Sequence, residues 1–329
     1  MNNKIINPFF NEFPDDVRDR LIERSKNEIW LYIMNKAELE KELAIEKEKE
    51  EKEQLKRKRE MEGITADIEM AITKLGKENV LGPKEIEKTL GVRFENVPEI
   101  QFSHEELERA KEMEQILILR VDRIEDGKPM SLEAMNTILA KRWEKEKKEG
   151  LLNTAEGWRD KVTGSKDFSE VAPRAGWALI SKELLKDSTS KNYIEQTEVI
   201  IKALREQAFK DMEMPEEYEE AIKEFEANKG RLTKLMSENW QQAAKELAEL
   251  KITQLTRQSI QETIYDLALY YDTNGKRLLP NAYTWSNSRS TDGGLVDLGL
   301  FGKWGVVGGS RRAPDYRGGA LGVLLSRRR

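Results

Sequence analysis

Glycine is distributed unevenly along this chain, and its positions limit what the C-terminal end can fold into. Ten of the 21 glycines fall in residues 281–329, after a long stretch of charged, helix-favouring sequence. Glycine adopts backbone angles with positive φ that other residues avoid, and closely spaced glycines interrupt helices. Residues 281–329 therefore predict a compact, β-rich segment with unusual turns.

The charge of the chain also changes near its end. Charged residues make up 36% of the sequence, against about a quarter in an average protein, which favours much exposed helix. The net charge is -5, yet residues 281–329 contain eight basic and three acidic residues. Because hydrophobic residues still make up 38%, the chain can build one or two modest cores and is not expected to be disordered.

The residues that most often carry enzyme chemistry are scarce. Cysteine is absent, which excludes disulfides, thiolate nucleophiles and cysteine-based zinc sites. The single histidine, His104, lies between Ser103 and Glu106, which form a capping-box pattern, so it is expected to be exposed in a first helical turn. With no phosphate-binding loop and no ligand-spaced metal motif, we expect no enzyme activity, no catalytic residue, no metal and no cofactor.

The N-terminus shows no targeting pattern. No basic region is followed by an apolar run, and no stretch approaches the roughly 20 apolar residues that a membrane span needs. We therefore expect a soluble protein made in the cytoplasm, with virion or surface association by another route left open.

Residues 1–101 are predicted to be helical. A helix opens after Pro14, and residues 46–59 read as a solvated, charged helical arm with opposite charges one turn apart. The alternative function of the run Lys56–Arg59 is a nucleic-acid or nuclear-localisation patch, although neighbouring glutamates cancel its field. Two shorter helices, over residues 64–75 and 83–90, loosely resemble a helix-turn-helix, but the acidity of this region disfavours the alternative of DNA binding.

Two further ranges precede the glycine-rich segment. Residues 102–190 predict a small α+β unit, with strands at 115–121 and 176–181 and a helix over 131–147. Residues 191–280 predict a helical bundle. Its long helix over 215–250 has a heptad pattern interrupted at Lys229–Gly230 and Asn239, which favours an antiparallel intrachain bundle over a dimeric coiled coil. Ser259 and Glu262 begin the last helix, and Gly275 ends it.

Residues 281–329 divide into short segments of strand length. The segments 294–301, 304–310 and 320–327 are each bounded by glycine or polar turns. In the last, Leu321, Val323 and Leu325 are expected to share one face of a half-buried strand. We expect Trp285 to be a core anchor and the arginine tail 327–329 to be a frayed, solvated end.

This segment resembles the C-type-lectin-like fold, in the version shared by formylglycine-generating-enzyme-type domains and the variable proteins of diversity-generating retroelements. The resemblance covers about fifty residues and is carried by short motifs: Tyr283, Trp285 and Ser286; Val306, Gly308, Gly309 and Ser310; and the closing strand 321–327. It implies a rigid fold whose exposed side chains bind a ligand and can vary widely. The absence of cysteine and of the calcium-binding lectin motifs leaves metal-independent binding of a protein or another macromolecule.

The candidate ligand-binding residues are the Trp, Tyr, Arg and neighbouring charged residues of this segment, because Trp, Tyr and Arg dominate binding hot spots. Asp297 is out of step with the apolar face of Val296, Leu298 and Leu300, and is expected to point to solvent. The candidates are Asp297, Lys303, Trp304, Arg311, Arg312, Asp315, Tyr316 and Arg317.

The fold class expected is therefore α+β, a mostly α-helical N-terminal scaffold with a small C-terminal β-rich, C-type-lectin-like module. The leading hypothesis is a non-enzymatic recognition protein that displays a ligand-binding surface, with retroelement diversification implied only by the resemblance. One alternative is a structural or assembly protein of a phage or cell envelope that acts through its helices. The other is nucleic-acid binding through the basic C-terminal block.

Overall fold

The computed structural model describes residues 14–28, 47, 49, 52, 63–94, 96–148, 150–152, 155–302 and 307–328. The chain divides into two compact units, Met1–Gly63 and Ile64–Arg329. In the first unit a helix over residues 15–28 begins after Pro14, as predicted, and carries an ion pair between Arg20 and Asp16 at 2.8 Å. Apart from three lysines, the predicted charged arm at 46–59 lies outside the described residues, as does Lys56–Arg59.

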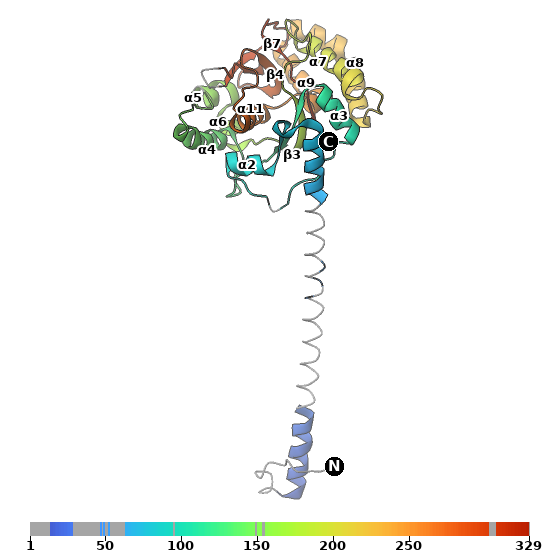
Figure 1. Ribbon diagram of the computed structural model, residues 1–329, viewed down its shortest axis with the longest axis vertical. Coiled ribbons are helices and arrows are strands. Elements are labelled where there is room, and N and C mark those ends of the chain that lie inside the picture. The colour runs from blue at the N-terminus through green and yellow to red at the C-terminus, as the bar shows by residue number, and fades with distance from the viewer. Residues whose placement is uncertain are drawn as a thin grey trace. The chain divides into compact units, whose positions relative to one another are not determined.

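The second unit is rich in helix and opens with a helix that covers residues 64–75. Figure 1 shows α4, α5 and α6 on one side of this unit and α7, α8 and α9 on the other. Its further helices, including two π-helical turns (η3, η4) and one 3-10 turn (η2), are η2 (Lys77–Asn79), α2 (Pro83–Leu90), α3 (His104–Glu112), α4 (Leu132–Lys145), α5 (Ala155–Gly157), η3 (Trp158–Thr163), α6 (Ser165–Glu170), α7 (Tyr193–Ala203), η4 (Leu204–Ala208), α8 (Glu216–Glu238), α9 (Trp240–Glu249), α10 (Lys251–Thr256) and α11 (Ile260–Asn274).

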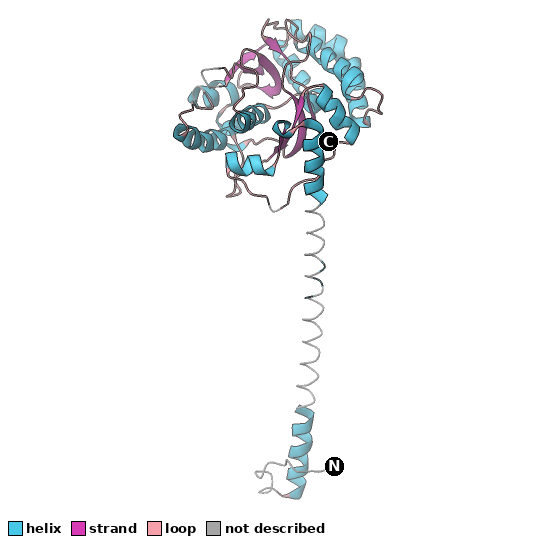
Figure 2. Cartoon of the chain, viewed as in Figure 1, coloured by secondary structure: helices cyan, strands magenta, loops and turns pink. Residues whose placement is uncertain are grey.

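Two four-stranded sheets lie among these helices (Figure 2). The first sheet has the order β1-β2-β3-β8, from β1 (Val80–Leu81), β2 (Gln115–Arg120), β3 (Gly176–Ser181) and β8 (Ser326–Arg328). The second has the order β6-β5-β4-β7, from β4 (Tyr283–Arg289), β5 (Leu295–Gly299), β6 (Gly308–Arg312) and β7 (Leu321–Gly322). In both sheets one outer pair is parallel, β1 with β2 and β4 with β7, and the other pairs are antiparallel. The predicted α+β class is thus confirmed.

Helix α11 contacts strands of both sheets and is buried along most of its length. Its start follows from the predicted capping box, because Ser259 accepts a hydrogen bond from the Glu262 amide while the Glu262 carboxylate accepts one from the Ser259 amide. Its end follows from Gly275, which adopts a φ of 67° that glycine tolerates at a helix C-terminus. A central helix with both ends fixed by local sequence thus connects the two sheets.

The strand β8 belongs to the first sheet, where its neighbour β3 is distant from it in the sequence. In β8, Ser326, Arg327 and Arg328 pair with Ile180, Leu179 and Ala178 of β3. The preceding residues alternate between two cores, since Leu324 packs with β2, β3 and α11 whereas Leu321, Val323 and Leu325 pack with α7, α8 and α9. Those three residues share one core, but the single strand predicted over 320–327 is wrong. Residues 323–325 lie between β7 of the second sheet and β8 of the first, and Leu324 on the opposite side is buried as well. Residues 281–328 therefore lie in one compact unit with the ranges 102–190 and 191–280.

The expectation of a frayed arginine tail is wrong for its described residues. Arg327 is 1% exposed, donates a hydrogen bond to Gln115 at 3.1 Å and lies 3.7 Å from the carboxylate of Glu106. Arg328 pairs with Glu262 at 2.8 Å. Arg327 is buried and Arg328 half-buried because β8 places them beside the buried carboxylates of Glu106 on α3 and Glu262 on α11. Arg329 lies outside the described residues.

Most of the predicted elements appear within a few residues of their expected bounds. The Ser103–Glu106 capping box and the exposed His104 are confirmed. The single helix predicted over 215–250 is wrong in one respect, because it is divided at Asn239 into α8 and α9. At Lys229–Gly230, where only the heptad pattern is interrupted, α8 continues. Among the described residues, no helix combines the length and apolar character needed to cross a membrane.

Replacing Arg328 tests whether the chain end stabilises the whole unit. Arg328→Ala should lower the free energy of unfolding by about 3 kcal/mol, because it leaves the buried Glu262 carboxylate with one of its two arginine partners. Arg231→Ala breaks an exposed pair with Glu246 and should cost less than about 1 kcal/mol. Urea denaturation measures both, and equal small effects would show that the chain end is not an integral part of the unit.

Candidate functional site

The second sheet presents two different faces. Paired residues on neighbouring strands point to the same face, so the pairing of β5 with β4 and β6 groups Asp297 with Trp285 and Ser310. Val296 and Leu298 point to the other face and join the core around α11. Asp297 therefore lies on the face of the second sheet that is opposite to the α11 core.

The turn after β6 is held against the start of α7. The amide of Tyr193 donates to the Pro314 carbonyl at 3.0 Å, and the amide of Ser190 donates to the Gly318 carbonyl at 3.0 Å. Arg317 adds an ion pair with Glu195 at 2.5 Å. Although burial opposes it, the Asn192 backbone and Arg317 hold the pKa of Glu195 below its ordinary value. Main-chain and side-chain contacts therefore fix this turn on a helix.

Arg312, Tyr316 and Asp297 form a layered group. The guanidinium carbon of Arg312 lies 4.1 Å from the centroid of the Tyr316 ring, and its Nε lies 3.3 Å from Asp297 Oδ2. The Asp297 side chain is 2% exposed, whereas that of Arg312 is 36% exposed. A buried carboxylate thus lies behind an arginine whose outer side faces solvent and whose flat face is covered by an aromatic ring.

Arg311 lies on the other face of β6, paired with Val296, and is not part of this group. Its Nε pairs with Asp292, and its Nη1 donates weakly to the Lys161 carbonyl at 3.4 Å. Burial opposes ionisation of Asp292, but hydrogen bonds from Ser290 and Arg311 hold its pKa below the ordinary value. We use the name arginine–tyrosine patch for the residues Tyr283, Asp297, Arg312, Tyr316 and Arg317.

The structure brings together several of the residues that sequence reasoning selected. Arg312, Tyr316 and Arg317 lie in the patch, whereas Arg311 lies on the opposite face of β6. Asp315 is exposed in the turn after β6, with no ion pair to any described residue. Lys303 and Trp304 lie outside the described residues.

Asp297 corrects one expectation. Although out of step with Val296 and Leu298 as predicted, it is buried rather than solvent-exposed, because Arg312 covers its face of the sheet. Burial raises the pKa of Asp297 to about 6, against the opposing charge of Arg312.

The expected position of Leu300 is also wrong, and Tyr283 is a site residue that was not among the candidates. Leu300 does not continue the apolar face of β5, since it adopts a φ of 48° and is 44% exposed. Tyr283, part of the resemblance motif, is a further residue of the patch, because it lies within electrostatic reach of Asp297, Arg312 and Tyr316. Burial and the Asp297 charge raise its pKa. Its pairing with β5 could have been found only from the register of the sheet.

The two glycines at the start of β6 have different surroundings. A Cβ on Gly309 would lie 2.6 Å from Cη2 of Trp158, a residue buried against the inner face of the strand. A Cβ on Gly308 would meet nothing closer than 3.4 Å and would lie 3.8 Å from the Tyr283 hydroxyl and 3.9 Å from Leu300 Cβ. The absence of a side chain at Gly309 therefore permits close packing of Trp158, whereas Gly308 has room for a methyl group beside the patch.

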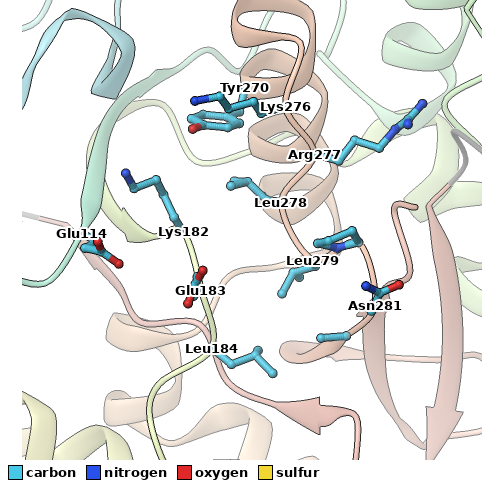
Figure 3. Close-up of a pocket in the computed structure, with 12 residues that line it drawn as sticks. Glu114, Lys182, Glu183, Leu184, Tyr270, Lys276, Arg277, Leu278, Leu279 and Asn281 are labelled. Carbon is cyan, nitrogen blue, oxygen red and sulfur yellow. The ribbon is translucent and has the colours of Figure 1, made fainter. Parts of the chain in front are cut away.

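A separate hollow of about 590 Å³ lies between the end of β3 and the segment that joins α11 to β4 (Figure 3). It is lined by charged side chains of both signs and by leucines, among them Glu114, Lys182, Glu183, Leu184, Lys276, Leu278 and Leu279. Arg277 points its guanidinium away from this space in Figure 3 and donates to the Tyr271 hydroxyl at 3.1 Å. Sequence reasoning missed this hollow because its lining comes from three distant segments without a local motif. Its balanced charges define no particular chemistry.

No group of three or more His, Asp or Glu residues that could hold a metal ion occurs within the described ranges. The arginine–tyrosine patch instead offers aromatic surface, guanidinium donors and one shielded carboxylate. Comparisons of the chain with protein-family models, curated proteins and solved structures find no match.

Adjacent glycine substitutions test the packing of β6. Gly309→Ala should lower the free energy of unfolding by about 1–3 kcal/mol, because its Cβ would overlap the buried Trp158 ring. Gly308→Ala is the matched control and should change it by less than about 0.5 kcal/mol. Thermal and urea unfolding provide the measurement, and equal destabilisation by both variants would contradict the close packing at Gly309.

The pH dependence of stability tests the burial of Asp297. Its carboxyl binds a proton more tightly in the folded protein than in the unfolded chain, so its stabilising contribution is complete below about pH 4 and is lost as the pH rises through about 6. Asp297→Asn cannot titrate, so its free energy of unfolding relative to wild type should rise by about 2 kcal/mol between pH 4 and 7. Parallel pH profiles for the two proteins would contradict this burial.

Proposed function

We propose that this protein is a non-enzymatic recognition protein that binds a protein partner through the arginine–tyrosine patch. The single observation that carries the proposal is Tyr316, which is 38% exposed and yet fixed in place, with Arg312 over its ring and Gly318 against its edge. Exposed aromatic residues that lose little freedom on binding are typical anchors of protein interfaces.

The backbone beneath the patch supports this proposal. The strand β6 pairs with β5 along its length, and the following turn is hydrogen-bonded to the residues around the start of α7. Because the backbone is held by main-chain contacts, the outward side chains need not stabilise the fold. A surface of this kind binds with a small ordering cost.

The pairing of the arginines favours a protein partner over nucleic acid. Arg311, Arg312, Arg317, Arg327 and Arg328 each form an ion pair with an acidic residue. Binding to a phosphate backbone depends on basic side chains that replace condensed counterions. Paired arginines, two of them largely buried, supply little of this uncompensated charge.

We also propose, from the sequence resemblance, that residues 281–329 contribute to a C-type-lectin-like fold. Three features support this: the buried Trp285, the Ser286 hydroxyl donating to the Val296 carbonyl at 2.7 Å, and the return of the closing strand to an earlier sheet. Calorimetry of residues 281–329 expressed alone measures whether this segment folds without the rest of the chain. A cooperative unfolding transition of the isolated segment would contradict the shared core described above. Diversification in the manner of retroelement variable proteins remains a proposal that neighbouring genes would test.

Point substitutions in the intact chain test the proposed function, since truncation would also remove β8 from the first sheet. Wild-type protein, Tyr316→Ala and Arg231→Ala would each be used for affinity capture from the source cells with quantitative mass spectrometry. A specific partner should be retained by wild type and Arg231→Ala but reduced about tenfold or more by Tyr316→Ala, a change of about 1.4 kcal/mol.

Arg231 is a suitable control because it lies on α8 in an exposed ion pair with Glu246. Circular dichroism and thermal unfolding would confirm that both variants are folded. If every partner is retained equally by the three proteins, the arginine–tyrosine patch is not the recognition surface.

A further inference from the structure

The three arginines within residues 311–317 differ in which of their guanidinium nitrogens donate a hydrogen bond. Arg317 uses both terminal nitrogens on Glu195, with Nη1 at 2.5 Å from one oxygen and Nη2 at 2.7 Å from the other. Arg311 is occupied by Asp292 and by the Lys161 carbonyl. Arg312 contacts Asp297 through Nε alone, and its two terminal nitrogens donate no hydrogen bond to any described residue.

The position of the counter-ion also distinguishes Arg312. Asp292 and Glu195 have side chains that are 49% and 32% exposed, so they neutralise Arg311 and Arg317 on the surface itself. Asp297 is 2% exposed and lies behind Arg312. The 3.3 Å contact between Nε and Oδ2 lacks hydrogen-bond geometry. The counter-ion of Arg312 therefore lies inside the protein, and the contact between them is an ion pair without a hydrogen bond.

Two contacts orient the Arg312 guanidinium before any partner binds. Asp297 holds its inner edge, and the Tyr316 ring covers one flat face at 4.1 Å. A planar guanidinium presents paired donors that match the two oxygens of a carboxylate, and such bidentate pairs are strong and directional. An arginine stacked on an aromatic ring loses less freedom when it makes these bonds.

We propose that Arg312 is the residue through which the patch binds a carboxylate, supplied by an aspartate or glutamate side chain of the protein partner. The inference rests on the proposed function and specifies the partner's chemistry. The carboxylate oxygens would accept hydrogen bonds from the two terminal nitrogens of Arg312. The apolar part of the same or a neighbouring partner residue would lie against Tyr316, which remains 38% exposed.

Small carboxylates test this inference without the partner. Sodium 3-phenylpropionate would be titrated into full-length protein labelled with ¹⁵N-arginine, and side-chain signals would be followed by NMR, with Arg312→Lys used for assignment. The Arg312 signal should shift saturably, whereas the signal of Arg231 should not. The uncharged 3-phenylpropionamide should bind at least about tenfold more weakly, because it cannot form the charge-assisted pair.

Two further readings make the test specific. Tyr316→Ala should weaken phenylpropionate binding, because it removes both the stacking on Arg312 and the apolar contact. The pKa of Asp297, followed by ¹³C NMR of its carboxyl, should rise when phenylpropionate is bound, because a second negative charge next to Arg312 disfavours ionisation of Asp297. An unchanged or lowered pKa would contradict binding at this position.

Equal shifts with the acid and the amide, or no shift of Arg312, would overturn the inference. A larger effect of inorganic phosphate than of phenylpropionate would also overturn it, in favour of a phosphorylated partner. These failures are distinguishable from failure of the proposed function. If Tyr316→Ala loses the captured partner while 3-phenylpropionate does not bind Arg312, the patch is a recognition surface that binds a group other than a carboxylate.

Discussion

The second unit depends on charged side chains that are buried where the chain's last strand meets α11. Arg120 on β2 donates to Asp266 at 3.0 and 2.5 Å and lies 3.5 Å from Glu262, which also pairs with Arg328 of β8. Although burial opposes ionisation, Arg120 and Arg328 hold the pKa of Glu262 below its ordinary value. Removing one partner of a buried pair is costly because it leaves an uncompensated charge. Correct placement of the last residues is therefore coupled to the central helix and to the first sheet.

This coupling bears directly on the arginine–tyrosine patch. The patch lies on residues 283–317, between α11 and β8, so both ends of its segment are joined to the same buried region. The turn 313–318 is further tied to the start of α7 through the Pro314 and Gly318 carbonyls. The side chains of Arg312 and Tyr316 can therefore project outward from a backbone that other residues keep in place. Binding energy at such a surface is not spent on ordering the loop.

Local patterns predicted the elements well, and non-local contacts explain the failures. Capping residues such as Ser103 and Ser259 act within one helical turn, and the run 115–121 could be recognised as a strand from its branched apolar residues. The burial of Asp297 could not be predicted, because it requires the register that pairs β5 with β6 and places Arg312 over that face. The buried Arg327 similarly depends on Glu106, more than two hundred residues earlier. Composition identified the segment that carries the candidate site. Only the tertiary structure shows that Arg312, unlike the neighbouring arginines, has a buried counter-ion and terminal nitrogens that donate no hydrogen bond to a described residue.

Amide hydrogen exchange, measured residue by residue over a range of urea concentrations, tests the central claim most directly. If buried ion pairs join residues 281–328 to the rest of the unit, the strand amides of β4, β5 and β8 should exchange only through global unfolding. Their opening free energy and urea dependence should then match those of α11. Exchange of these strands through a smaller opening, while α11 and β2 remain protected, would show that the C-terminal segment is stabilised separately and would contradict the coupling.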